Sequence, residues 1–372
     1  MRSTGQDQQK QRSFWQRLHI DVPLLIGLLA LMILGLFVVY SAGGQDTALV
    51  IRQVTRLGIA LSVMFFIAQI PPLSYRKWAV PIFVIGLLML VAVLLFGQVG
   101  KGAQRWLNLG IIPPFQPSEI MKLVVPIMIA WFISQYNLPV KLSNVVIAFI
   151  LVLMPTLLIA KQPDLGTSLL IASSGIFVIF LAGAGWKLIS ICVGLGSAFA
   201  PILWFFLMKD YQKQRVLTFL NPEQDPLGSG YHIIQSKIAI GSGGLQGKGW
   251  LQGTQSQLEF LPEPHTDFIF AVFSEEFGLI GVALLLLVYL AIVMRGAWIA
   301  VNAQHAFTKL LAGSLTLTFF VYVFVNIGMV SGLLPVVGVP LPLVSYGGTS
   351  MVTLMAGFGM LMAISTHRRF IT

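Results

Sequence analysis

Charged residues and cysteine are both scarce in this chain of 372 residues. Only 10% of its residues are charged and 56% are hydrophobic, whereas soluble domains carry about a quarter charged residues. The single cysteine, Cys192, excludes a disulfide framework. The sequence holds no zinc-type Cys/His cluster, no G-x-x-x-x-G-K-[ST] phosphate loop and no G-x-S-x-G elbow. With no ATP site of this type, a reaction would need a substrate that arrives already activated, and transport is the alternative.

The apolar residues gather in runs of roughly 20, the length of a helix that crosses a bilayer core. We therefore expect an all-α, polytopic membrane protein with about ten transmembrane helices and one large extracytoplasmic loop, 208–266. The expected spans are 22–40, 52–70, 77–96, 119–135, 143–160, 165–183, 187–207, 267–294, 307–332 and 347–366.

Basic residues collect in the two tails and in alternate short connections, which together hold 12 of the 23 Lys and Arg residues. The positive-inside rule makes that side cytoplasmic. The expected organisation is a cytoplasmic tail (1–21), a ten-helix membrane domain (22–366) and a cytoplasmic tail (367–372). Most acids fall on or near the outer face, where we expect chemistry or ligand binding.

Asp267, in "LPEPHTDFIF", precedes a long apolar run that we expect to form one helix ending near Arg295. Counting back about 20 residues from Arg295 places Glu275 at the edge of the hydrocarbon core. A straight helix then carries Asp267 roughly 12 Å higher, at the depth of lipid headgroups. Two interpretations stay open: Asp267 is a helix N-cap, or it is the acid of a site.

Three further motifs carry ionisable residues near the outer ends of predicted helices. Glu119 and Lys122 share one helix face, either as a self-neutralising pair or with the cation placed for an anionic headgroup. Asp164 fits an N-cap. Arg52 and Arg56 fit either snorkelling anchors or phosphate ligands.

The stretch "LPVVGVPLPLVSYGGTS" (334–350) cannot form a regular helix, because prolines interrupt it and a Gly pair follows them. Non-helical backbone at membrane depth must be buried in protein or line a cavity. We expect a cavity wall, formed by Pro340, Pro342, Tyr346, Gly347 and Gly348. The alternative is a hydrophobic loop on the outer surface.

Five segments together resemble the hallmark motifs of the SEDS family (shape, elongation, division and sporulation), most closely its RodA-type elongation members. They are "RWLNLGIIPPFQPSEIMK", "KQPDLGTS", "GYHIIQSKIAIGSGGLQGKGW", "FLPEPHTDFIFAVFSEEFG" and "PLPLVSYGGTS", in that order. The resemblance runs from about residue 20 to the C-terminus. It implies a peptidoglycan glycosyltransferase that polymerises lipid II, an undecaprenyl-diphosphate disaccharide-pentapeptide, on the outer face of the bacterial inner membrane during elongation and rod-shape maintenance.

The resemblance also implies roles for individual residues. The family's essential acid falls on Asp267, its S-E-x-x-K pair on Glu119 and Lys122, and the arginine of its R-W segment on Arg105. Asp267 is the catalytic candidate. The candidates for contact with the diphosphate headgroup are Arg105, Glu119, Lys122, Asp164, Arg52 and Arg56. Asp267 fits a general base or the ligand of a divalent cation, Mg²⁺ or Mn²⁺, and no other cofactor is expected.

The expected partners are a class B penicillin-binding protein, which crosslinks the glycan, and other membrane proteins of the elongation complex; nucleic acid is not expected. A lipid II flippase and a non-catalytic scaffold are the alternative functions. Transporters place their sites near the bilayer midplane, whereas no Asp, Glu, Lys or Arg lies at the middle of a predicted span here. This favours chemistry at one face.

Overall fold

The computed structural model covers the whole bundle except the tails and several short stretches. It describes residues 18–100, 103–108, 114–137, 140–162, 164–183, 190, 194, 197–198, 201, 203–208, 210–221, 229–257, 261 and 263–367.

Nine of the ten predicted spans are helices in these described ranges. They are α3 (Val22–Ala42), α4 (Thr47–Ala68), α5 (Pro72–Phe96), α6 (Pro117–Ile133), α7 (Leu142–Lys161), α8 (Leu165–Leu181), α13 (Ile269–Val301), α14 (Ala306–Val330) and α15 (Thr349–Thr366). Seven of them are long and apolar enough to cross a membrane, while α6 and α8 have 17 residues each. The multi-pass helical class is confirmed. The count of ten is not, because the predicted span 187–207 lies largely outside the described residues and contributes only a short π-helix, Leu203–Leu207.

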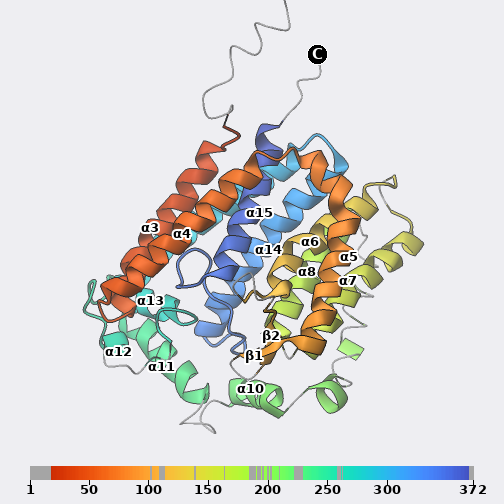
Figure 1. The fold of residues 1–372 in the computed structure, drawn as a ribbon. Helices are drawn as coiled ribbons and strands as arrows, with labels where there is room; N and C mark the ends of the chain where they lie inside the picture. The colour runs from red at the N-terminus through yellow and green to blue at the C-terminus, as the bar shows by residue number, and fades with distance from the viewer. Residues whose placement is uncertain are drawn as a thin grey trace, which may run out of the picture.

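The remaining elements gather at one end of the bundle (Figure 1). They are a β-hairpin, β1 (Gln98–Gly100) with β2 (Ala103–Trp106), and three helices of the long connection, α10 (Asp210–Leu220), α11 (Ser229–Ser242) and α12 (Thr254–Gln257). We call this the hairpin end. The start of α3 and the end of α15 lie at the opposite end. The sequence predicts one large loop in the connection and does not predict the hairpin.

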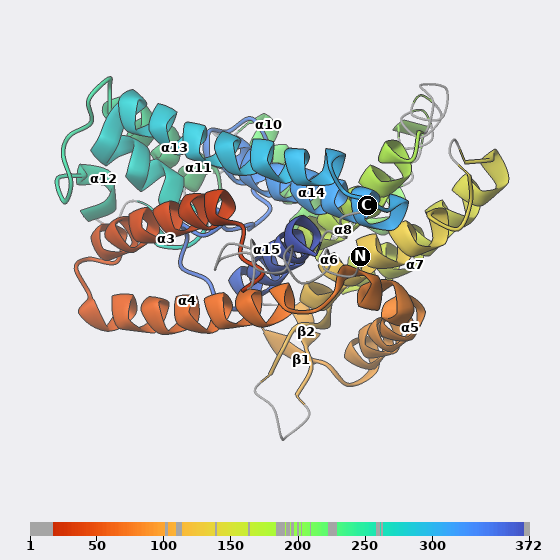
Figure 2. The same cartoon turned by 90° about the horizontal axis from the view of Figure 1, so that it is seen from above.

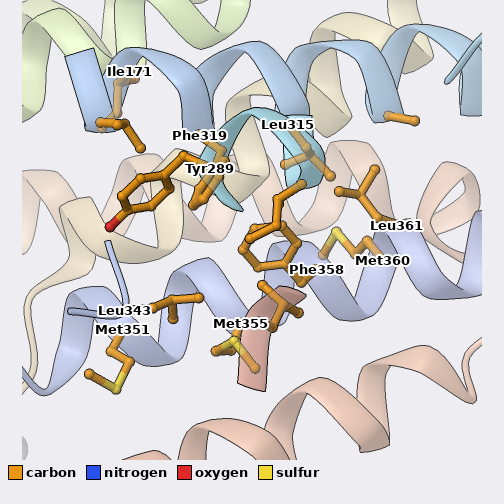
Figure 3. Close-up of a cluster of buried hydrophobic side chains, with 14 of the residues drawn as sticks. Ile171, Tyr289, Leu315, Phe319, Leu343, Met351, Met355, Phe358, Met360 and Leu361 are labelled. Atoms are coloured by element: carbon orange, nitrogen blue, oxygen red, sulfur yellow. The ribbon is translucent and has the colours of Figure 1, made fainter. Parts of the chain in front are cut away.

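Helix α15 occupies the centre of the bundle, between α4 and α14 (Figure 2). Aromatic rings join three helices in the buried core (Figure 3): Phe319 of α14 lies 5.9 Å from Tyr289 of α13 and 4.9 Å from Phe358 of α15, between ring centres. The Tyr289 hydroxyl donates to the Pro342 carbonyl over 2.7 Å. The core therefore fixes the proline-rich segment 334–348 against α13.

Helix α13 is broken, so the expectation of one straight helix is wrong. Gly278 has φ 62° and ψ −164°, a conformation that glycine adopts without a Cβ penalty. We call residues 269–277 the short arm and 279–301 the long arm. The short arm is almost entirely buried, whereas Leu279 and Ile280 directly after the break are 58% and 56% exposed. The height inferred for Asp267 assumed a straight helix and therefore does not hold.

An ion pair closes the end of the bundle opposite the hairpin. Asp21 caps α3 by accepting from the Leu24 N–H. Its two carboxylate oxygens accept from the Arg295 guanidinium of α13 at 2.9 and 2.8 Å, and Ser365 of α15 donates to it over 2.6 Å. Burial alone would raise the pKa of Asp21, but the hydrogen bonds and the charge of Arg295 outweigh it and hold that pKa below 3.8.

Asp21→Ala is expected to lower the free energy of unfolding by about 3 kcal/mol, because it leaves Arg295 without its buried partner. Since the pKa of Asp21 is lower in the folded state, its stabilisation is present above the unfolded pKa and disappears as the pH falls through the folded one. Thermal unfolding of the purified protein in detergent measures both effects. An Asp21→Ala protein that unfolds at the wild-type temperature would contradict the assignment.

Candidate active site

Asp267 lies in a turn just before α13 and not at its N-cap, which is Phe268. Asn326 of α14 holds the backbone on both sides of the site, since its amide nitrogen donates to the Asp267 carbonyl over 3.0 Å and to the Val339 carbonyl over 2.7 Å. A Cβ built on Gly338 would lie 3.4 Å from an Asp267 carboxylate oxygen. The half-buried carboxylate therefore faces Gly338 of the proline-rich segment.

Gly338 is also part of the wall of a polar pocket of about 120 Å³. Two cations, Arg105 and Lys122, and two carboxylates, Glu119 and Asp164, line this pocket. The other lining residues come from the start of α6, from α8, α14 and α15, and from the proline-rich segment: Gln116, Gly166, Thr167, Leu170, Tyr322, Val337, Gly338, Val339, Pro340 and Ser350. A water molecule takes about 30 Å³ of liquid volume, so the pocket has room for several waters or a small anionic group. Four of the predicted diphosphate candidates thus meet beside Asp267.

Asp164 serves both as a cap and as a member of the pocket. One carboxylate oxygen accepts from the Thr167 N–H at the start of α8, at 3.2 Å. The other accepts from the Gln116 amide at 3.1 Å and lies 3.5 Å from Arg105 Nη1. The N-cap interpretation of Asp164 therefore describes half of its contacts, and the other half orient Arg105 and Gln116.

Glu119 and Lys122 form a buried ion pair of 2.7 Å on α6. Among the residues that the structure describes, the second carboxylate oxygen of Glu119 is buried and has no hydrogen-bond partner. The Lys122 ammonium lies 5.2 Å from the centre of the Tyr322 ring, and the buried Tyr322 hydroxyl interacts with Lys122. The ion pair itself agrees with both sequence interpretations, but Glu119 lines the pocket, where its second oxygen can accept from a polar ligand.

Sequence reasoning missed Tyr322 and Gln116. Tyr322 is a lone tyrosine within an apolar run, and Gln116 stands in a proline-rich approach to α6. Neither residue belongs to a pattern of charged or catalytic spacing, so no signal marked them. Only the packing of α14 against α6 shows that Tyr322 reaches Lys122.

Of the remaining predicted residues, only Pro340 lines the pocket. Arg52 pairs with Asp46 at 3.6 Å, and both side chains are about half exposed. Arg56 lies over the Tyr346 ring, 4.4 Å from its centre. Of the predicted cavity wall, Pro340 lines the pocket, whereas the other members are not part of its lining: Pro342, Tyr346, Gly347 and Gly348.

The proline-rich segment is non-helical, as predicted, and neighbouring parts of the protein hydrogen-bond to it. The Tyr346 N–H donates to the His265 carbonyl over 2.8 Å, and Ser345 Oγ donates to the Thr266 carbonyl over 2.7 Å. Gln53 of α4 donates to the Ser345 carbonyl over 3.2 Å. Partners of this kind are what irregular backbone at membrane depth requires, and the bonds to His265 and Thr266 tie the segment to the turn that carries Asp267.

The arrangement suits the binding and transfer of a group with an anionic leaving group. Arg105 is 33% exposed, whereas Lys122 is only 7% exposed, so the guanidinium lies nearer the opening and the ammonium deeper. Cations placed in this way stabilise negative charge that develops on a leaving group. A carboxylate such as that of Asp267 can accept a proton from an attacking hydroxyl.

Metal-ligating side chains do not gather here. Among the residues that the structure describes, no three His, Cys, Asp or Glu side chains are placed to hold a metal ion together. A divalent cation at Asp267 would therefore take most of its ligands from a diphosphate and from water, which is the usual way in which Mg²⁺ binds.

Known proteins resemble the chain over nearly its full length. The profile of the cell cycle protein family FtsW/RodA/SpoVE matches residues 19–370. The peptidoglycan glycosyltransferase MrdB of Escherichia coli (strain K12) is 58% identical over 366 residues, covering 98% of this chain and 99% of that protein.

Solved structures share the fold. A chain from a peptidoglycan synthase complex, solved in work on the coordination of polymerization and crosslinking, aligns with a TM-score of 0.80 at 31% identity, over 93% of this chain and 97% of that one. The rod shape determining protein RodA of Thermus thermophilus aligns with a TM-score of 0.70 at 28% identity, over 93% and 96% of the two chains.

Proposed function

The chain belongs to the FtsW/RodA/SpoVE family of cell cycle proteins and is a peptidoglycan glycosyltransferase, and on this premise we propose that it polymerises lipid II at the pocket beside Asp267. The family is the SEDS family expected from the motifs. One observation carries the proposal. The Asp267 carboxylate faces Gly338, and Gly338 also lines the pocket that holds two cations.

In the proposed reaction, the diphosphate of the donor lies against Arg105 and Lys122, and Asp267 faces the sugar carbon that bears it. A hydroxyl oxygen of the acceptor sugar attacks that carbon as Asp267 takes the hydroxyl proton. A new carbon–oxygen bond forms, the bond from carbon to diphosphate oxygen breaks, and the diphosphate leaves with the polyprenyl chain. The cations lower the barrier because they bind the charge that accumulates on the leaving oxygen.

The charges of the pocket set a condition on this reaction. Arg105 and Lys122 are balanced by Asp164 and Glu119, so the pocket is close to neutral without substrate. A diphosphate must therefore share or displace these carboxylates. The 3.5 Å contact of Arg105 with Asp164 is the longer of the two pairs, so Arg105 is the cation that exchanges its partner most easily.

The protein is a multi-pass inner-membrane protein. We propose that both termini are cytoplasmic and that the hairpin end faces outward. The basic tails and short connections support this orientation through the positive-inside rule. The pocket would then open toward the side on which glycan strands are built, and the apolar helices around it would hold the polyprenyl tail.

We also propose a class B penicillin-binding protein as the partner, within a larger set of elongation membrane proteins. A solved chain of the same fold comes from a peptidoglycan synthase complex in which polymerization and crosslinking are coordinated. A partner of this class is expected to raise the polymerisation rate several-fold. Purified protein with lipid II, with and without the partner, tests this by gel analysis of glycan strands. Equal rates with the partner shown to be bound would contradict activation.

The same purified system tests the function itself. Polymer formed from lipid II by the protein, with its partner, is the expected result. Failure to form polymer under both conditions, together with movement of labelled lipid II across a proteoliposome bilayer, would favour the flippase instead.

A further inference from the structure

The break in α13 is repaired by a loop from another part of the chain. In a continuous helix the amides of Leu279 and Ile280 would donate to the carbonyls of residues 275 and 276. Here they donate to the Gly244 and Leu245 carbonyls instead, at 2.9 and 3.1 Å. The carbonyls of residues 275 and 276 accept from the amides of residues 248 and 249, at 3.0 Å each. Two helical hydrogen bonds are thus replaced by four hydrogen bonds to the loop.

Glycines allow the loop to approach this closely. A Cβ built on Gly247 would lie 2.1 Å from the Glu276 carbonyl oxygen, and a Cβ built on Gly243 would lie 2.1 Å from the Ser274 carbonyl oxygen. Both obstacles are backbone atoms, so a side chain at either position would force the loop and the helix apart.

Two buried glutamates fasten the short arm to the same loop. Glu275, with 0% exposure, accepts from the Lys248 ammonium at 2.7 Å and from both the amide and the hydroxyl of Thr254 at 2.9 and 3.0 Å. Glu276 accepts from the Leu251 amide at 3.2 Å and from the hydroxyl of Ser41 on α3. The short arm, the loop and α3 are therefore locked together.

We propose that residues 243–255 act as a splint that completes the broken helix, and that Glu275 and Lys248 are positioning residues for Asp267. The inference rests on the proposed role of Asp267 in glycosyl transfer. Asp267 stands two residues before the short arm, and six residues, about 9 Å of helix axis, separate Ile269 from Glu275. A rigid, buried arm of this length transmits a shift at the splint to the Asp267 carboxylate.

Two glycine substitutions in the same loop provide a matched test. Gly247 and Gly244 both have positive φ, 81° and 56°, so alanine strains the backbone at either position by roughly 1–2 kcal/mol. Only the Gly247 methyl group would collide with α13, since a Cβ on Gly244 meets nothing within 4 Å. Gly247→Ala is expected to lower kcat for lipid II polymerisation at least tenfold with KM within twofold, and to speed hydrogen exchange at the amides of Leu279 and Ile280. Gly244→Ala should change kcat and KM less than twofold.

Normal kcat in Gly247→Ala would overturn the proposal. If that variant does not fold, Lys248 supplies the second test: Lys248→Met should lower kcat three- to tenfold, and Lys248→Arg should restore most of it, because arginine keeps the charge opposite Glu275. Full activity of Lys248→Met in a folded protein would equally overturn the proposal. Absence of polymer from the wild-type protein with its partner would instead defeat the proposed function, and near-normal polymerisation by Asp267→Asn would defeat the catalytic role of Asp267. Both outcomes are distinguishable from a failure of the splint.

Discussion

Asp267→Asn is expected to lower kcat for lipid II polymerisation by roughly 10²–10⁴-fold, the usual contribution of general acid–base catalysis. The amide keeps the size of the side chain but cannot take the proton and carries no charge. Helix stability gives no competing explanation, because the N-cap of α13 is Phe268. The measurements are glycan synthesis from lipid II, and thermal unfolding, which should stay close to wild type.

Asp46→Asn is the matched control. Asp46 is the N-cap of α4 and accepts from the Ala48 amide at 2.8 Å, and asparagine caps helices about as well as aspartate. This variant should polymerise normally. Near-normal polymer from Asp267→Asn would refute the catalytic assignment. Loss of activity that added Mn²⁺ partly restores would favour a metal-ligand role over that of a base.

A neutral replacement of the α6 ion pair, Glu119→Gln with Lys122→Met, is expected to lower polymerisation about 10²-fold while the protein still folds. Replacing both members of a buried ion pair with neutral residues of similar size is often close to neutral for stability. Lys122→Ala alone would be a poorer test, because it leaves the Glu119 carboxylate buried and unpaired at a cost of about 3–5 kcal/mol. Removing one preorganised donor to a developing negative charge typically costs 10²–10³ in kcat.

The exchanged pair, Glu119→Lys with Lys122→Glu, separates the two interpretations of this site. It preserves mutual neutralisation on one helix face but moves the ammonium by nearly a turn of α6. We expect it to insert and fold and to remain inactive. Full activity of the exchanged pair would show that the two residues serve only to neutralise each other, and the proposed role of Lys122 at the diphosphate would fail.

The sequence predicted most helices and the charged residues of the pocket because both leave local signals. Runs of apolar residues mark the spans, and charged residues are conspicuous where charge is rare, so Glu119, Lys122 and Asp164 were found from composition and position. The resemblance to a known family added Arg105. The sequence does not predict that α6, α8 and the proline-rich segment bring these side chains together around Gly338.

The break at Gly278 was missed for a different physical reason. A single glycine within a long apolar run is tolerated in a helix at a cost of about 1 kcal/mol, so it does not by itself end the predicted span. The break forms because a loop that precedes it in the sequence, residues 244–249, supplies the missing backbone partners. A helix broken in this way is stable only when the loop is in place. Local helix propensity therefore does not predict the break.

The contacts at the end of the bundle opposite the hairpin carry a consequence for biosynthesis. Asp21 is made early, but Arg295 follows 274 residues later and Ser365 344 residues later. At typical synthesis rates of 5–20 residues per second, α3 waits roughly 15–70 s in the membrane before both partners emerge. His19 likewise gains its stacking contact only after His367 is made, and the centres of the two rings lie 3.6 Å apart. Helix α3 therefore gains these contacts only after α13 and α15 have been made, so a chain that stops short of α15 leaves Asp21 without Ser365 and His19 without His367.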